Sequence, residues 1–146
     1  MITKRRLLVG LAAGIAAVGL GIPAASATTA APVTQVIKVK AVTNTTSVIQ
    51  TTNSYTFIAA LWQGSKNVGQ VTVTCYFTSQ TSPGNCGFAA NFYGSGFIFG
   101  HVMNNKTGAA GTVNGGTGSF PNAHGTILVV GPGNVSWITL SFTTSH

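Results

Sequence analysis

The segment from Val113 to Ile127, VNGGTGSFPNAHGTI, decides the fold of this chain. Its first part, Asn114 to Gly118, consists mainly of Asn and Gly, which adopt positive φ at little cost, and so predicts a sharp turn. Phe120 follows as an apolar side chain that we expect to fill the core. We interpret these glycines as residues that allow the turn and not as a ligand-binding loop, because a phosphate or dinucleotide site would need a following helix and further motif residues.

The first 27 residues have the order of a secretory signal peptide. Lys4, Arg5 and Arg6 precede an apolar run from Leu7 to Ile22, and a small-residue cleavage site ends at Ala27. A transmembrane anchor is the alternative, but the run is short for a bilayer span. We expect a secreted bacterial protein with no stable membrane insertion after cleavage. The adjacent arginines leave the general secretory and twin-arginine routes both open.

Residues 28–146 have the length of one domain with its own core. We expect residues 28–53 to supply an N-terminal strand and a polar loop, and residues 54–146 to supply the rest of the same domain. The lysines beyond the signal peptide are scattered and form no basic stripe, so we predict no nucleic-acid partner. They are Lys38, Lys40, Lys66 and Lys106.

The chain contains no Asp and no Glu. This composition excludes a Ser-His-Asp triad, a paired-carboxylate glycosidase site, a calcium loop and a carboxylate-bound magnesium site. It also removes most groups whose protonation destabilises proteins in acid. We therefore hypothesise an acidic extracellular setting; compositional drift in a chain rich in Thr, Asn and Gly is an equal alternative.

Short alternating segments separated by turn residues predict an all-β domain, and no convincing amphipathic helix occurs. The alternation is cleanest from Val71 onward, whereas the apolar run from Tyr55 predicts a strand largely buried on both faces. A short extended piece is expected near Val48. Eight antiparallel strands in series favour a closed barrel, because closure removes exposed edges, with a β-sandwich as the alternative. The expected strands are 34–42, 55–63, 71–78, 86–93, 97–103, 109–113, 126–130 and 135–143.

Cys75 and Cys86 flank a segment that contains Pro-Gly-Asn, which favours a hairpin turn. In an exported protein, one pair of cysteines at this spacing predicts a disulfide across the hairpin. A metal site would be incomplete with two Cys and no nearby His or carboxylate. A free catalytic Cys stays open as the other alternative.

The order of these features resembles the allene oxide cyclase-like and dirigent-like barrels, over roughly Tyr55 to Phe142. The resemblance implies an eight-stranded antiparallel barrel with an apolar cavity, which guides cyclisation or coupling by confinement and uses neither a metal nor an organic cofactor. Carboxylate-assisted chemistry of that family has no counterpart in this chain. The matching positions are Gly115, Gly116, Thr117, Gly118, Phe120, Ala123 and Gly125.

Neutral side chains with polar tips are the candidates for a site. His101 and Tyr93 are the candidate catalytic groups, since the pKa of histidine lies near neutrality, although a histidine beside aromatics is often structural. His101, His124 and His146 have no zinc spacing, and no metal site is predicted. The candidate cavity-lining residues are Tyr55, Trp62, Tyr76, Asn91 and Asn114.

Three functions stay open at this point. The first is an isomerase-like or coupling-guide barrel acting on an apolar small molecule, and the second is a noncatalytic carrier of such a molecule. The third is a structural or self-associating surface protein, for which a homo-oligomer would be expected. A large cavity favours the first two, and an interior packed solid favours the third.

Overall fold

The computed structural model describes residues 31–78, 84–105, 108–131 and 133–145. The expected signal peptide, the Ser82-Pro83 part of the hairpin turn, Lys106 and His146 lie outside this description. Residues 31–146 belong to one compact unit. Within the described ranges, no helix is long and apolar enough to span a membrane.

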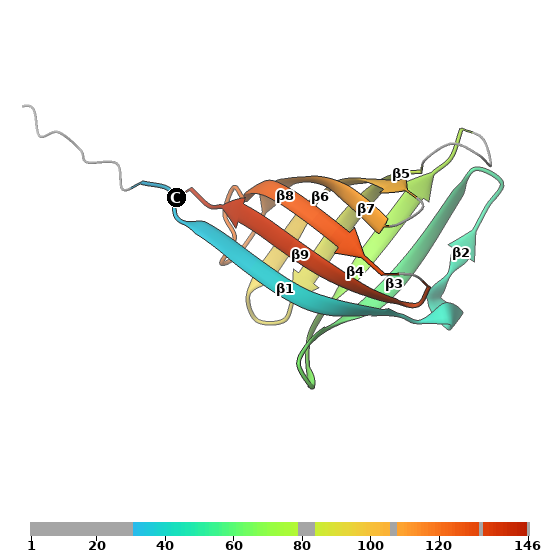
Figure 1. The fold of residues 1–146 in the computed structure, drawn as a ribbon, viewed down its shortest axis with the longest axis horizontal. Helices are drawn as coiled ribbons and strands as arrows, with labels where there is room; N and C mark the ends of the chain where they lie inside the picture. The colour runs from blue at the N-terminus through green and yellow to red at the C-terminus, as the bar shows by residue number, and fades with distance from the viewer. Residues whose placement is uncertain (1–30, 79–83, 106–107, 132, 146) are drawn as a thin grey trace, which may run out of the picture. The chain divides into compact units, whose positions relative to one another are not determined.

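Strands and one short 3-10 turn make up the regular structure of this unit (Figure 1). In chain order they are β1 (Thr34–Thr43), η1 (Thr45–Ser47), β2 (Ile49–Gln50), β3 (Ser54–Gln63), β4 (Lys66–Tyr76), β5 (Asn85–Phe92), β6 (Gly96–Asn105), β7 (Gly108–Gly116), β8 (His124–Val130) and β9 (Val135–Thr143).

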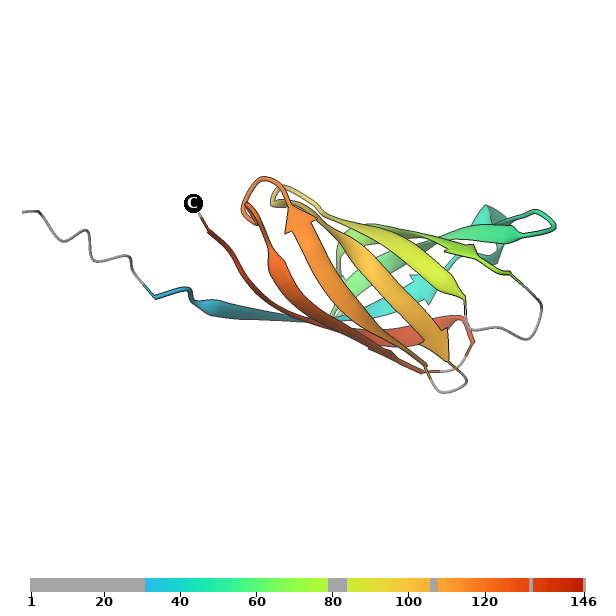
Figure 2. The ribbon, with the colours of Figure 1, turned by 90° about the horizontal axis from the view of Figure 1, so that it is seen from above.

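The strands pair antiparallel in the order β1-β9-β8-β7-β6-β5-β4-β3, and β1 also pairs with β3. The last pairing closes eight strands into a barrel, which confirms the predicted fold class and rules out the sandwich. Strand β2 is a two-residue addition that pairs with the start of β3. The strands are inclined to the barrel axis, as closure requires (Figure 1, Figure 2).

Alternate residues of each strand point into the barrel interior. Val71 and Cys75 on β4 are 3% and 1% exposed and point inward together with Val73, whereas Thr72 and Thr74 face outward. The expectation that β3 is buried on both faces is wrong. Ala59 and Leu61 point inward, but Ile58 is 37% exposed. The physical reason is that a small closed barrel covers one face of each strand, and no second layer covers the other.

The Gly-rich segment after β7 closes one end of the barrel. Phe120 is buried there, with its ring edge-on to the rings of Phe92 and Phe142 at centroid distances of 5.6 and 5.8 Å. Gly118 has φ +63°, and a Cβ at this position would overlap the backbone oxygen of Ser95. A turn that only glycine can make therefore holds an aromatic ring in the core.

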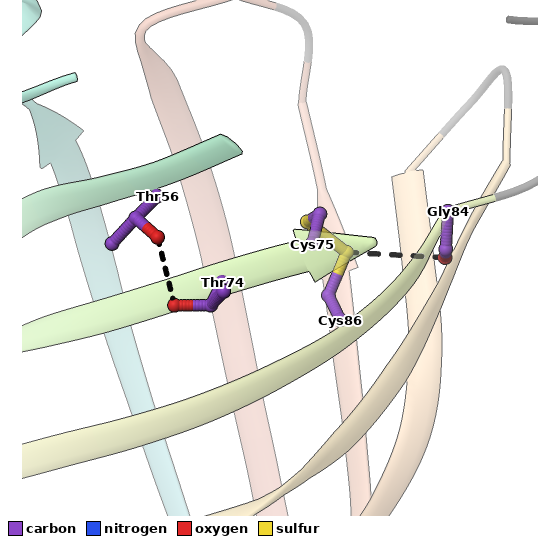
Figure 3. Close-up of a disulfide and its surroundings, with 5 residues drawn as sticks. All are labelled: Thr56, Thr74, Cys75, Gly84 and Cys86. Carbon is purple, nitrogen blue, oxygen red and sulfur yellow. Dashed lines mark hydrogen bonds between the residues drawn. A yellow bond between two sulfur atoms is a disulfide. The ribbon is translucent and has the colours of Figure 1, made fainter. Parts of the chain in front are cut away.

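The predicted disulfide between Cys75 and Cys86 is present (Figure 3). The two residues lie directly opposite each other on β4 and β5, and both are almost fully buried. Next to Cys75 in sequence, the Thr74 hydroxyl lies 3.0 Å from the Thr56 hydroxyl of β3. The disulfide thus joins two strands near the end of the barrel opposite Phe120.

Candidate ligand-binding cavity

A cavity of about 760 Å³ occupies the half of the barrel that contains the disulfide. Inward-facing residues of β1 and β3 to β9 form its wall, with Val71, Phe88 and Ile127 among the apolar ones. Its mouth lies where β4 ends and β5 begins. A second void, of about 10 Å³, lies deeper between residues such as Leu61 and Phe92. The barrel is therefore hollow at one end and tightly packed toward the other.

The cavity has the volume of a small-molecule site, since such sites usually measure about 300 to 1,000 Å³. Apart from backbone groups, its polar atoms come from a few neutral side chains near the mouth, and no charged side chain is found among the described residues that line it. These neutral side chains are Thr43, Tyr55, Asn104, Asn134 and Ser136.

Tyr55 provides the titratable group of this lining. Its ring is stacked between the rings of Phe57 and Phe77, at centroid distances of 5.3 and 5.8 Å and interplanar angles of 15° and 10°. Burial raises the pKa of the Tyr55 hydroxyl above its usual value, because the charged phenolate would be poorly solvated. The hydroxyl is therefore protonated at neutral pH and can donate a hydrogen bond.

Tyr55 is the predicted cavity-lining residue that the structure places in the cavity wall. The other four predicted residues lie on the outward face of their strands, because each follows or precedes a buried inward residue. Tyr76, for example, follows Cys75 and is 64% exposed. The four outward residues are Trp62, Tyr76, Asn91 and Asn114.

The candidate catalytic residues also lie away from the cavity. Tyr93 is 56% exposed in the turn after β5. His101 is exposed on the outer face of β6, where its Nδ1 lies 2.9 Å from Nδ2 of Asn114. The Asn114 amide donates to Nδ1, so a neutral His101 carries its proton on Nε2. A catalytic role for either residue stays a prediction, and the geometry gives it no link to the cavity.

No group of three or more His, Cys, Asp or Glu residues gathers in the described part of the chain. His124 lies at the start of β8, on the outer face.

Sequence reasoning missed the polar residues of the mouth. Asn104 is the second-last residue of β6 and Asn134 precedes β9, and both lie outside the strand ranges expected from the sequence. Ser136 could have been found, because it alternates with the inward residues Ile138 and Leu140 on β9. The informative feature is whether a residue occupies an inward-facing or an outward-facing position in the alternation of its strand, and not whether it is polar.

No family model and no curated protein matches this chain. Among solved structures, it is similar to a pyocyanin demethylase with a TM-score of 0.62 and 18% sequence identity. The similarity covers 73% of this chain and 99% of that protein's chain. At this level of identity the likeness concerns the fold, and it agrees with the strand pairing described above. The chain is thus a small antiparallel β-barrel with a cavity at one end.

Proposed function

We propose that this protein binds one apolar, uncharged small molecule in the cavity of its barrel. The observation that supports this most directly is a cavity of about 760 Å³ whose described lining carries no charged side chain. A charged ligand would lose its hydration there without gaining an opposite charge, and that loss is costly. An apolar ligand would instead gain from the release of water at the Val and Phe surfaces.

The Tyr55 hydroxyl is the polar anchor of this proposal. Tyr55 lines the cavity, and its hydroxyl stays protonated at neutral pH and makes no hydrogen bond to another described side chain or backbone group. Stacking on Phe57 and Phe77 holds the ring, so that little side-chain entropy would be lost on binding. The ligand class that suits this site is an apolar molecule with one carbonyl, ether or ring-nitrogen acceptor.

Two versions of the function follow from the same cavity. An allene oxide cyclase-like or dirigent-like protein would hold one conformer of a reactive ligand, and would speed its cyclisation or coupling by confinement. A noncatalytic carrier would release the ligand unchanged. Because the chain lacks carboxylate side chains, the catalytic version must rely on confinement and on the Tyr55 hydroxyl. The open cavity supports both versions over a purely structural barrel.

The disulfide and the N-terminal sequence support an extracellular site of action. Disulfides persist mainly in oxidising compartments outside the cytoplasm. The Cys75–Cys86 bond would therefore be stable in a secreted protein. We include secretion in the proposal, with removal of residues 1–27 on export.

The test is a titration of the purified protein with the uncharged fluorophore N-phenyl-1-naphthylamine and, separately, with pyocyanin. Val73→Trp should fill the cavity, because Val73 lines it, and should weaken binding by at least about tenfold. The matched control is Thr72→Trp, which adds the same indole at the adjacent residue on the outer face. Equal binding by both variants, or no binding by the unmodified protein, would refute the proposal. Mass spectrometry of the recovered ligand separates turnover from carriage.

A further inference from the structure

Both tryptophans of the chain lie beside the same lysine on the outer face of the barrel. Lys40 of β1 is the register partner of Trp62 on β3 and of Trp137 on β9. All three point outward, because their strand neighbours Val39, Leu61 and Ile138 are buried in the interior. We call these three residues the Trp-Lys-Trp row.

The pairing places a tryptophan on each side of Lys40. Directly opposite residues of antiparallel strands have Cβ atoms about 4.5 to 5.5 Å apart, so an indole flanks the Lys40 stem on each side. Lys40 is partly buried, whereas Lys38 on the same face is exposed and has no residue of β3 as a partner. Trp137 is nevertheless 61% exposed, which leaves much of its ring available to a partner.

Two of the three lysines that the structure describes lie on this outer face of β1, because Lys38 is two residues before Lys40. The third, Lys66, is exposed in the hairpin between β3 and β4. Strand β9 contributes no charge to this surface. Because the sequence contains no Asp and no Glu, no side chain of the protein can neutralise these lysines. Their counter-charge must come from solvent ions or from a binding partner.

We propose that the Trp-Lys-Trp row binds an acidic polysaccharide. Indole rings stack on the apolar C–H faces of pyranose rings, and a lysine between them can pair with the carboxylate of a uronic acid. Beyond Trp137, the outward residues of β9 are Thr139, Ser141 and Thr143, whose hydroxyls suit the hydroxyl groups of a sugar chain. This surface lies outside the cavity, so the proposal does not depend on the proposed function.

The same charges argue against the two other occupants. A second copy of the chain placed on this row would bring lysine against lysine, with no carboxylate to compensate. A lipid surface would meet Trp137 and its exposed β8 partner Val130, but it would also meet the hydroxyl residues along β9 and the lysines of β1, which interrupt the apolar face. Both alternatives are included as outcomes of the test.

The test measures binding of the purified protein to polygalacturonate by isothermal titration, with fully methyl-esterified polygalacturonate as the uncharged matched polymer. We expect binding to the acidic polymer, and we expect it to weaken as the NaCl concentration rises from about 50 to about 500 mM. Salt screens exposed charges increasingly over this range. Trp137→Ala should weaken binding at least about tenfold at any salt concentration, and Trp137→Phe less. Lys40→Gln should weaken it about threefold, and mainly at low salt.

Two control variants separate the row from general effects. Met103→Ala removes another exposed apolar side chain, on β6, and Lys106→Gln removes the same charge from the segment between β6 and β7. Both should bind as the unmodified protein does. Equal binding of the two polymers, no binding, or unchanged binding by Trp137→Ala would overturn the proposal. So would binding to phosphatidylglycerol vesicles without binding to the polymer, or self-association in sedimentation that Trp137→Ala abolishes.

Discussion

Replacing Phe120 by alanine should destabilise the barrel strongly without changing the cavity. Phe120 is 7% exposed, so transfer of its ring from the core to water costs about 2 to 3 kcal/mol. Loss of the edge-on contacts with Phe92 and Phe142 adds about 0.5 to 1 kcal/mol for each pair. The total, about 3 to 5 kcal/mol, agrees with the usual cost of truncating a buried Phe.

Urea denaturation measures this free energy of unfolding, and the melting temperature should fall by roughly 12 to 20 °C. Phe97→Ala is the matched control, because the same ring is removed from an outward position that is 44% exposed. Its free energy of unfolding should change by less than about 1 kcal/mol. The ligand affinity of folded Phe120→Ala should equal that of the unmodified protein, because Phe120 does not line the cavity. Equal stability of the two variants would show that Phe120 does not hold the barrel end.

Three further predictions concern the turn, the disulfide and the dependence of stability on pH. Gly118→Ala should lower the free energy of unfolding by at least about 2 kcal/mol, because Gly118 has a positive φ and a Cβ there would overlap the backbone. Gly64→Ala should lower it by about 1 kcal/mol, because Gly64 has φ +61° but open space around it, and thermal melts of both variants check this. Removing the Cys75–Cys86 bond with a double alanine variant should lower the free energy of unfolding by about 2 to 3 kcal/mol in urea, because the bond restricts the unfolded chain by closing a short loop. Unchanged stability would contradict this. The pKa of Tyr55 is higher in the folded state, so the protonated form contributes stability that is complete below the unfolded pKa of about 10 and is lost as pH rises through the folded value. Tyr55→Phe should flatten this alkaline loss in melts above about pH 10, and both proteins should change little between pH 7 and pH 3, because the chain has no Asp or Glu.

The strand pattern was readable from the sequence because alternation has a physical cause that acts locally. Val71, Val73 and Cys75 alternate with threonines, and the structure places the first set inside the barrel. The ends of β7 and β8 were harder to predict, since Gly115 and Gly116 continue β7 without side chains. Backbone pairing needs no side chain, so apolar patterning ends before the strand does.

The site could be predicted less well than the fold. Tyr55, Trp62 and Tyr76 all have a polar tip on an apolar body, and composition does not distinguish an inward from an outward position. Their distance along the strand from a residue known to face inward does distinguish them. Tyr76, for example, directly follows the inward-facing Cys75 and therefore faces outward. The volume of the cavity depends on side chains from eight strands at once, and no local pattern in the sequence reports it.

The ring of Phe120 makes the cavity a dead end. A molecule that enters at the mouth near the disulfide cannot pass through the barrel, because Phe92, Phe120 and Phe142 fill the far end. Ligand uptake and release must therefore both occur at the end of the barrel that contains the disulfide. If the ligand is converted, the product must leave by the path through which the next substrate molecule enters. Product should therefore inhibit competitively with substrate, and product release should limit the rate of turnover.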